Sequence, residues 1–147
     1  MTGRLKLIAM DDEDLPVLSA YCQDAVLKVS DISFLPKERR FVLAMNRFVW
    51  EQVEPGRRTN YRRCRSVLHF ERVGQVRSRG LDRNDPDAVL ELLAITFTPS
   101  QLPAGAIELA FSGGATLQLD VECVEAQLTD MAAMWETVSR PVHRGIS

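Results

Sequence analysis

The hydrophobic period of this chain changes once, near residue 25, from the spacing of a helix to the alternation of a strand. Before that point, apolar side chains recur every three or four residues over about 12–25, which predicts one amphipathic helix. After it, apolar and polar residues alternate through most of the chain. A chain with this pattern buries its sheet against one helix, so we predict an α+β class dominated by strands.

Acidic residues and a proline indicate where the helix begins. Asp11 or Asp12 supplies a side-chain oxygen that caps free amide groups, and Asp14 adds negative charge to the first turn. Pro16 falls early enough in the helix to cost no hydrogen bond. A short strand, with Leu5, Leu7 and Ala9 on one face, precedes this start signal.

The segment 32–50 predicts a β-hairpin. The apolar residues of its second strand form two groups of opposite parity. We therefore predict a β-bulge near Asn46 and Arg47, which would return both groups to one side. The groups are Phe41, Leu43 and Met45, followed by Phe48 and Trp50.

A strand that begins near Tyr61 alternates clearly between two faces. One face is expected to be buried, with Cys64, Ser66, Leu68 and Phe70. The other is expected to be wet, with Arg63, Arg65, Val67 and His69. Further along, Gly113 and Gly114 separate two alternating segments, and adjacent glycines permit the positive φ angles of a tight hairpin turn.

These elements predict a strongly curved antiparallel sheet or small open barrel of about seven to eight strands, with one N-terminal amphipathic helix. Thr129 and Asp130 are expected to cap a short C-terminal helical turn that carries Met131, Met134 and Trp135. At 147 residues the chain suits one hydrophobic core. We predict a single domain over 1–138 and a frayed tail over 139–147.

Targeting signals and cysteines indicate the compartment. The first apolar stretch is short and runs into four consecutive acidic residues, so it does not resemble the core of a signal peptide. No apolar run reaches the roughly 18 residues that span a bilayer. Cys22, Cys64 and Cys123 are odd in number and widely spaced, which disfavours a disulfide framework. We expect a cytoplasmic protein with free thiols and no membrane contact.

Catalytic and metal-binding motifs are not evident. The two histidines, His69 and His143, are far from each other in sequence, and the cysteines lack the paired spacings of a zinc site. Cys64 and His69 are separated by an odd number of residues on one strand, so they face opposite sides. Gly113 and Gly114 are followed by a strand and by no lysine, unlike a phosphate-binding loop. We expect no metal and no cofactor, and binding rather than catalysis.

Charge is strongly segregated along the sequence. The segment Arg57–Arg83 contains nine arginines against Glu71 and Asp82, whereas 84–130 contains eight acidic residues and no lysine or arginine. A candidate basic patch follows from this segment. Its members are Arg57, Arg58, Arg62, Arg63, Arg65 and His69.

Three interpretations of the basic segment remain open. Its arginines can pair within the chain with Asp120, Glu122 and Glu125, they can dock on an acidic protein, or they can contact nucleic acid. We expect first a non-enzymatic protein-binding or adaptor role through an exposed sheet face or edge. The alternative is RNA binding through Arg57–Arg83. A weaker alternative is small-molecule binding, or an enzyme whose site is assembled from scattered residues.

Several short motifs carry a family resemblance that covers most of the chain. The motifs are Leu5-Lys6-Leu7-Ile8, Asp14-Leu15, Gln23-Asp24-Ala25-Val26, Pro36-Lys37-Glu38-Arg39-Arg40-Phe41, Asn46-Arg47-Phe48, Phe111-Ser112-Gly113-Gly114, Val121-Glu122-Cys123-Val124-Glu125, Asp130, Trp135 and Arg140-Pro141. With these motifs the chain resembles a family of small uncharacterised bacterial proteins, common in alphaproteobacteria, that bears a domain-of-unknown-function label. That resemblance implies no activity, ligand or catalytic residue.

Overall fold

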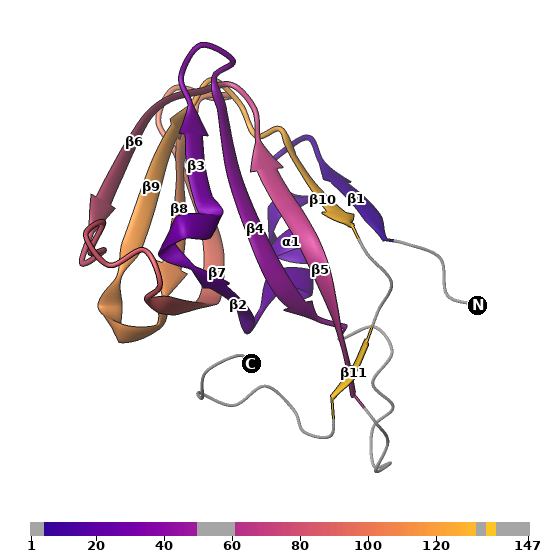
Figure 1. Ribbon diagram of the computed structural model, residues 1–147. Helices are drawn as coiled ribbons and strands as arrows, with labels where there is room; N and C mark the ends of the chain where they lie inside the picture. The colour runs from indigo at the N-terminus through magenta and orange to yellow at the C-terminus, as the bar shows by residue number, and fades with distance from the viewer. Residues whose placement is uncertain (1–4, 50–60, 132–134, 138–147) are drawn as a thin grey trace.

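One antiparallel sheet contains most of the chain (Figure 1). The computed structural model describes residues 5–49, 61–131 and 135–137. Within these residues, one α-helix, α1 (Leu15–Cys22), and two 3-10 turns, η1 (Val29–Asp31) and η3 (Ser112–Gly114), accompany the strands. The strands are β1 (Lys6–Ala9), β2 (Ala25–Lys28), β3 (Ile32–Leu35), β4 (Arg40–Phe48), β5 (Tyr61–Phe70), β6 (Val73–Arg79), β7 (Val89–Pro99), β8 (Gly105–Phe111), β9 (Thr116–Val121), β10 (Ala126–Asp130) and β11 (Trp135–Thr137).

The sheet is curved and open. Its strand order is β1-β10-β5-β4-β2-β7-β8-β9-β6, with β3 also paired to β4 and β11 also paired to β5. β1 and β6 are therefore its two terminal strands, and the sheet curls between them without closing into a barrel (Figure 1). The predicted class, a curved and mostly antiparallel sheet with one helix, is confirmed. The predicted strand number was too low, because segments expected to be bends or turns form short strands of their own.

The helix is shorter than predicted, at eight residues. The predicted cap was wrong, because Asp14 rather than Asp11 or Asp12 is the N-cap residue and makes no side-chain capping bond. Asp11 Oδ1 instead accepts a hydrogen bond from the Asp14 amide at 3.0 Å in the turn before the helix. Pro16 occupies the first turn, where its missing N–H removes no helical bond. Leu15, Leu18 and Cys22 form the buried side of the helix, which lies against β7.

The β8–β9 hairpin forms as predicted. Gly113 and Gly114 both have positive φ, at 76° and 83°. An added Cβ would meet no atom within 4 Å at either position. Backbone conformation, rather than crowding, is therefore what requires glycine here.

The predicted bulge in β4 was wrong. β4 pairs with β5 in unbroken register from Phe41, opposite Phe70, to Phe48, opposite Arg63. Strict alternation therefore continues, so Arg47 points inward with Met45 while Phe48 is buried on the outer side. The bulge was inferred from the opposite parity of the two apolar groups, on the assumption that all of them face one side. Phe48 is instead buried on the outer side, so the change of parity needs no bulge.

The predicted C-terminal helical turn does not occur at the residues that the structure describes, and Met134 lies outside them. Thr129 and Asp130 end β10, and the segment Trp135–Thr137 is strand β11, which pairs with Tyr61–Arg63 of β5. β10 and β11 thus pair with the same edge of β5. Pairing with β5 outweighs the local preference of Thr129 and Asp130 for capping a helix. The expected tail over 139–147 lies outside the described residues, as does Trp50.

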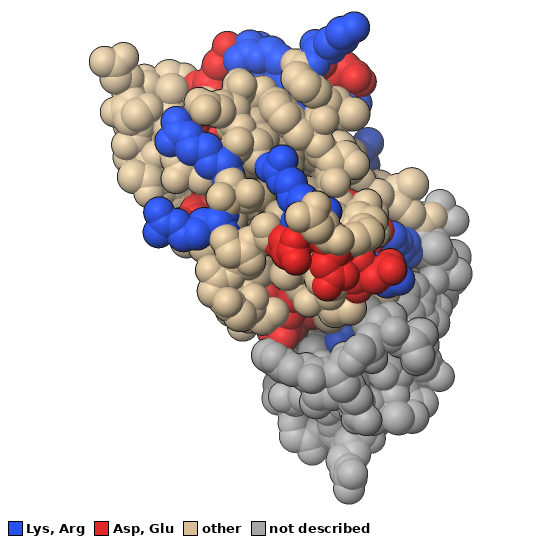
Figure 2. Space-filling model, turned by 60° about the vertical axis from the view of Figure 1, so that its left-hand side comes forward, with Lys and Arg blue, Asp and Glu red and all other residues tan. Residues whose placement is uncertain are grey.

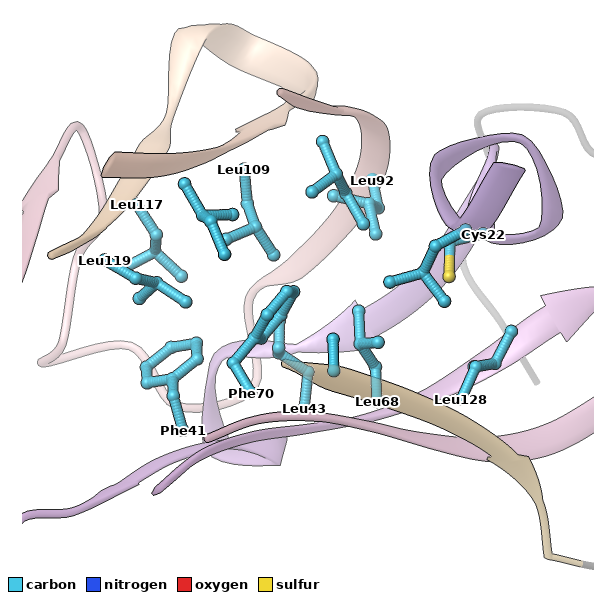
Figure 3. Packing of buried hydrophobic residues seen from close by; sticks show 14 of the residues in the cluster. Cys22, Phe41, Leu43, Leu68, Phe70, Leu92, Leu109, Leu117, Leu119 and Leu128 are labelled. Carbon is cyan, nitrogen blue, oxygen red and sulfur yellow. The ribbon is translucent and has the colours of Figure 1, made fainter. Parts of the chain in front are cut away.

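The core fills the inside of the curve. Side chains from β4 and β5 face those from β8 and β9 across it, with the helix residue Cys22 and the β7 residue Leu92 at one end (Figure 3). Each fully buried large apolar side chain contributes on the order of 1.5–3 kcal/mol relative to exposure. The core holds the strands in the register that positions the outer face. Its labelled members are Cys22, Phe41, Leu43, Leu68, Phe70, Leu92, Leu109, Leu117, Leu119 and Leu128.

Candidate functional site

The outer face of the sheet brings polar residues from three strands and a valine from a fourth into one row. Val26 of β2 lies opposite Glu91 of β7 on one side and opposite Asn46 of β4 on the other. Asn46 in turn lies opposite Arg65 of β5. Because directly opposite residues share a face of the sheet, all four side chains lie on the outer face.

A cleft opens beside this row, where β2 leaves the edge of β4. β2 pairs with β4 at Val26, η1 then turns the chain, and β3 resumes pairing with β4 from Ile32. We call the resulting hollow of about 240 Å³ the outer cleft. Its lining combines apolar and charged residues. They are Val26, Leu27, Lys28, Asp31, Asn46, Arg65 and Val89.

Arg65 organises the polar wall of the outer cleft. Its Nη1 donates to Asn46 Oδ1 at 3.2 Å, and its Nη2 donates to Asp31 Oδ1 at 3.1 Å. The other oxygen of Asp31 accepts the backbone N–H of Lys28 at 3.0 Å, which fixes η1. The Arg65 side chain is still 38% exposed, so a guanidinium with five N–H donors faces the cleft with donors left over.

A second charged group lies next to the outer cleft. The Arg63 guanidinium lies 5.9 Å from the centre of the Phe48 ring and donates from Nη1 to the Asn46 backbone oxygen at 3.3 Å. Burial, followed by the hydrogen bond and charge of Asp24, raises the pKa of Glu91 to about 7, and Arg63 opposes this rise. Burial also lowers the pKa of Arg63, against the opposing charges of Asp24 and Glu91.

The Glu91 carboxyl can gain or lose a proton near neutral pH. The Glu91 carboxyl is hydrogen-bonded to that of Asp24, and this contact adds to burial in raising the pKa of Glu91. Neither residue stood out in the sequence, since no spacing links them. Only the pairing of β2 with β7 brings them together.

A second arginine network lies on the inner face and also escaped prediction. Arg47 is fully buried and donates from Nε and Nη2 to the two oxygens of Asp130, at 3.2 Å and 3.1 Å. Ser66 Oγ and the Leu5 amide also donate to Asp130, at 2.7 Å and 3.1 Å. Burial alone would raise the pKa of Asp130, but the hydrogen bonds from Arg47 and Ser66 hold it below its usual value.

Nearby side chains complete this inner network. The Arg47 guanidinium lies 5.9 Å from the centre of the Tyr21 ring. Burial raises the pKa of the Cys22 thiol to about 12, with a smaller opposing effect from the charge of Arg47. A thiol in this state is a poor nucleophile, so Cys22 acts as a core residue.

The predicted basic patch is only partly described. Arg57 and Arg58 lie outside the described residues, as does the side chain of Arg62. Arg63 and Arg65 lie on the outer face as expected. Arg65 lines the outer cleft, whereas Arg63 contacts only its lining residue Asn46.

His69 lies toward the other end of β5 from this cleft. Its Nδ1 is 2.7 Å from Glu71 Oε2, which also accepts Arg40 Nε at 2.8 Å. Cys64 is buried while His69 is half-buried on the outer side, so the predicted opposite placement of these two is confirmed.

The segregated charges of the sequence are mixed in the folded chain. Arg77 Nη2 donates to Asp120 Oδ2 at 3.0 Å, and Arg72 Nε donates to Glu125 Oε1 at 3.4 Å. Arg72 also lies 3.9 Å from Glu122. Figure 2 shows basic and acidic side chains interspersed over the face it presents, rather than gathered into one basic field. Internal pairing therefore accounts for part of the basic segment.

Metal ligands do not cluster in the described part of the chain: no group of three or more His, Cys, Asp or Glu residues there could hold an ion. Within the same residues, the single helix is too short to cross a membrane.

Comparisons with known proteins give a family and no function. The family model described as "Protein of unknown function (DUF2948)" matches residues 5–143. None of the curated proteins matches the chain, and none of the solved structures does. The matched span includes both the outer-cleft residues and the inner Arg47–Asp130 pair. On this match, the chain belongs to the DUF2948 family.

Proposed function

We propose that this protein is a cytoplasmic protein-binding domain, and that its outer cleft receives an acidic side chain of the partner. The observation that carries the proposal is the cleft itself, a small hollow with apolar walls and two cationic side chains. The three cysteines are free thiols, which supports a reducing compartment.

The size of the cleft favours a protein partner over a metabolite. Small-molecule sites have volumes of about 300–1,000 Å³ and enclose most of their ligand. The outer cleft, at about 240 Å³, is smaller and lies on the outside of the sheet. A hollow of this size suits one side chain that projects from a larger partner surface.

The lining favours an acidic residue with apolar neighbours. Lys28 and Arg65 bring two positive charges to the cleft against one negative charge on Asp31. The side chains of Lys28 and Arg65 are 54% and 38% exposed, so both can reach an incoming carboxylate. Val89, which is 46% exposed, offers apolar contact at the rim.

RNA binding is the alternative, and the positions of the arginines argue against it. Arg65, Arg72 and Arg77 each lie beside a carboxylate, which weakens the local positive potential that a polyanion needs. A single acidic side chain can still compete for one guanidinium, because an exposed ion pair is worth only about 0.2–1 kcal/mol. We therefore favour an acidic protein segment.

A selection from random displayed peptides tests the proposal. The native chain is expected to enrich peptides that contain Asp or Glu next to apolar residues. Arg65→Ala and Lys28→Ala are each expected to raise the dissociation constant of the selected peptides by about tenfold. The matched control is Arg77→Ala, an arginine on the same outer face but on β6, which is expected to leave affinity unchanged.

Two outcomes would overturn the proposal. One is that acidic peptides are not enriched, or that they bind the Arg65→Ala variant as tightly as the native chain. The other is that mixed-sequence RNA binds with steep salt dependence and that the same two variants abolish this binding, which would replace the protein partner with a nucleic acid.

A further inference from the structure

One carboxyl group at the border of the outer cleft is far more buried than the charged side chains that line the cleft. Glu91 of β7 is 7% exposed. The side chains of Lys28 and Arg65 are 54% and 38% exposed. Burial opposes the charged form of a carboxyl group, so the groups that face Glu91 decide the pH at which it ionises.

The register of β2 and β7 places Glu91 next to the outer cleft. Glu91 lies directly opposite Val26, and Val89, two residues earlier on β7, lies opposite Lys28. Val26, Lys28 and Val89 all line the cleft. Glu91 and Lys28 are therefore diagonal neighbours on the outer face, with Cα atoms about 7–8 Å apart. An ionised Glu91 would lie within range of one of the two cations of the cleft.

Two charged groups act directly on Glu91. The carboxyl of Asp24, just before β2, is hydrogen-bonded to it, and the Arg63 guanidinium of β5 opposes the effect of Asp24 through its charge. Burial, followed by Asp24, raises the pKa of Glu91 to about 7. β4 and η3 add the uncharged Asn46 and Ser112, whose Oγ accepts the Glu91 amide at 3.1 Å. Glu91 therefore changes from neutral to charged as the pH rises through neutrality.

The other charged groups of this region belong to the cleft and its rim. Lys28 lies 3.9 Å from Asp87, whose side chain is 84% exposed, so water competes with this contact. Arg65 is hydrogen-bonded to Asp31. The buried side of α1 belongs to the core, so its titratable side chains do not face Glu91. Lys28 is therefore the cation of the cleft that register places next to Glu91.

We propose that Glu91 regulates the outer cleft in response to pH: its neutral form permits an acidic side chain of the partner to bind, and its ionised form opposes that binding. This inference rests on the proposed function, because it concerns the same cleft and the same class of ligand. An ionised Glu91 attracts Lys28 and repels the incoming carboxylate. At a separation of about 8 Å near the protein surface, one such charge is expected to lower the affinity about three- to fivefold between about pH 6 and pH 8.

Isothermal titration calorimetry with a selected acidic peptide that contains no histidine tests this inference. The native chain is expected to lose about three- to fivefold in affinity from about pH 6 to pH 8. It is also expected to take up a fraction of a proton on binding near pH 7, because ligand and proton favour the same form of Glu91. Two buffers with different ionisation enthalpies measure this uptake.

Glu91→Gln separates this effect from the rest of the cleft. Glutamine keeps an N–H donor for Asp24 and does not ionise, so the variant is expected to bind equally well across the pH range and to take up no proton. The matched control is Glu108→Gln, at an exposed carboxylate on β8. A second control, His69→Gln, removes the half-buried histidine of β5. Both controls are expected to keep the native pH dependence.

The outcomes distinguish this inference from the proposed function. Acidic peptides that bind the native chain equally well at both ends of the pH range would overturn the role of Glu91 and leave the proposed function in place. An unchanged pH dependence in Glu91→Gln, or its loss in His69→Gln, would do the same. Absence of peptide binding at every pH would overturn both.

Discussion

Two arginine–carboxylate pairs lie on opposite faces of the same part of the sheet, around β4 and β5. On the inner face, Arg47 and Asp130 have side chains that are 0% and 3% exposed. On the outer face, Arg65 and Asp31 are 38% and 21% exposed. The shortest N–O distances are the same, 3.1 Å, so the two pairs differ in their surroundings rather than in their length.

The surroundings decide what each pair can do. On the inner face, water does not take the place of either residue when its partner is removed. Arg47 and Asp130 therefore depend on each other, and the pair has a structural role. Outside, water competes with Asp31 for Arg65, and the pair contributes little to stability. Arg65 can therefore exchange its partner for an incoming ligand at low cost. The same residue types are structural on one face and available for binding on the other.

The largest expected effect tests whether the inner network is sealed from water. Burial raises the pKa of Cys22 from its usual value of 9.0 to about 12, so its thiolate fraction falls by about a thousandfold. In the native protein, iodoacetamide is expected to label the half-buried Cys123 and to leave Cys22 unlabelled. Mass spectrometry of the digested protein measures both sites. Labelling of both cysteines in urea is the control. Equal labelling rates for Cys22 and Cys123 in the folded protein would show that water reaches the inner network.

The next largest effect is expected on the free energy of unfolding when Arg47, the arginine of the inner face, is replaced. Arg47→Met leaves Asp130 buried without its main counter-charge, so we expect a loss of about 3–5 kcal/mol in the free energy of unfolding. Urea denaturation measures this loss. The matched substitution on the outer face, Arg65→Met, is expected to cost about 1 kcal/mol or less. Equal losses for the two variants would remove the distinction between the faces.

Glu91 differs from the other charged residues of the outer-face row because it is buried. Its contribution to the stability of the fold depends on pH. Its pKa is about 7 in the folded protein and near 4.5 when unperturbed, so the folded state binds more protons between these values. Stability is therefore lost as the pH rises through this window. Glu91→Gln avoids the ionisation, and we expect it to raise Tm by a few degrees near pH 8 and by less near pH 5.

Thermal unfolding at the two pH values measures this difference. Glu108→Gln, which changes an exposed carboxylate on β8, is the control and is expected to change Tm little at either pH. If Glu91→Gln and Glu108→Gln behave alike, the carboxyl pair with Asp24 does not influence stability.

The smallest effect is expected at an exposed ion pair. Arg77 and Asp120 lie 3.0 Å apart, but their side chains are 58% and 38% exposed. Arg77→Met is expected to lower the free energy of unfolding by about 0.2–1 kcal/mol. The shift in the urea midpoint measures it. A loss as large as that of Arg47→Met would mean that exposure does not determine the strength of these pairs.

Local patterns predicted most of the strands and the faces of their side chains. Alternation placed Cys64 inward and His69 outward, and two glycines identified the β8–β9 turn. The predictions that were wrong concern residues whose contacts lie far away in the sequence, which a rule based on neighbouring residues does not detect. The bulge near Arg47 was inferred from the change of parity at Phe48. Without the bulge Arg47 faces inward, where it meets Asp130, a partner 83 residues away that the sequence pattern does not reveal.

The candidate site was predicted only in part for the same reason. Charge in the sequence drew attention to Arg63 and Arg65, which lie on the outer face, and Arg65 lines the outer cleft. It did not indicate Asp24, Glu91 or Asp31, because their positions follow from the pairing of β2 with β4 and β7.

By itself the sequence determined one early helix, an antiparallel class and the face on which most strand residues lie, because alternation is a property of neighbouring residues. The tertiary structure alone decided which strands pair when they are far apart in the chain. Strand order brings Arg47 to Asp130 and opens the cleft beside Arg65, since pairing joins residues far apart in the chain. It also decided which strands end the sheet, namely β1 and β6.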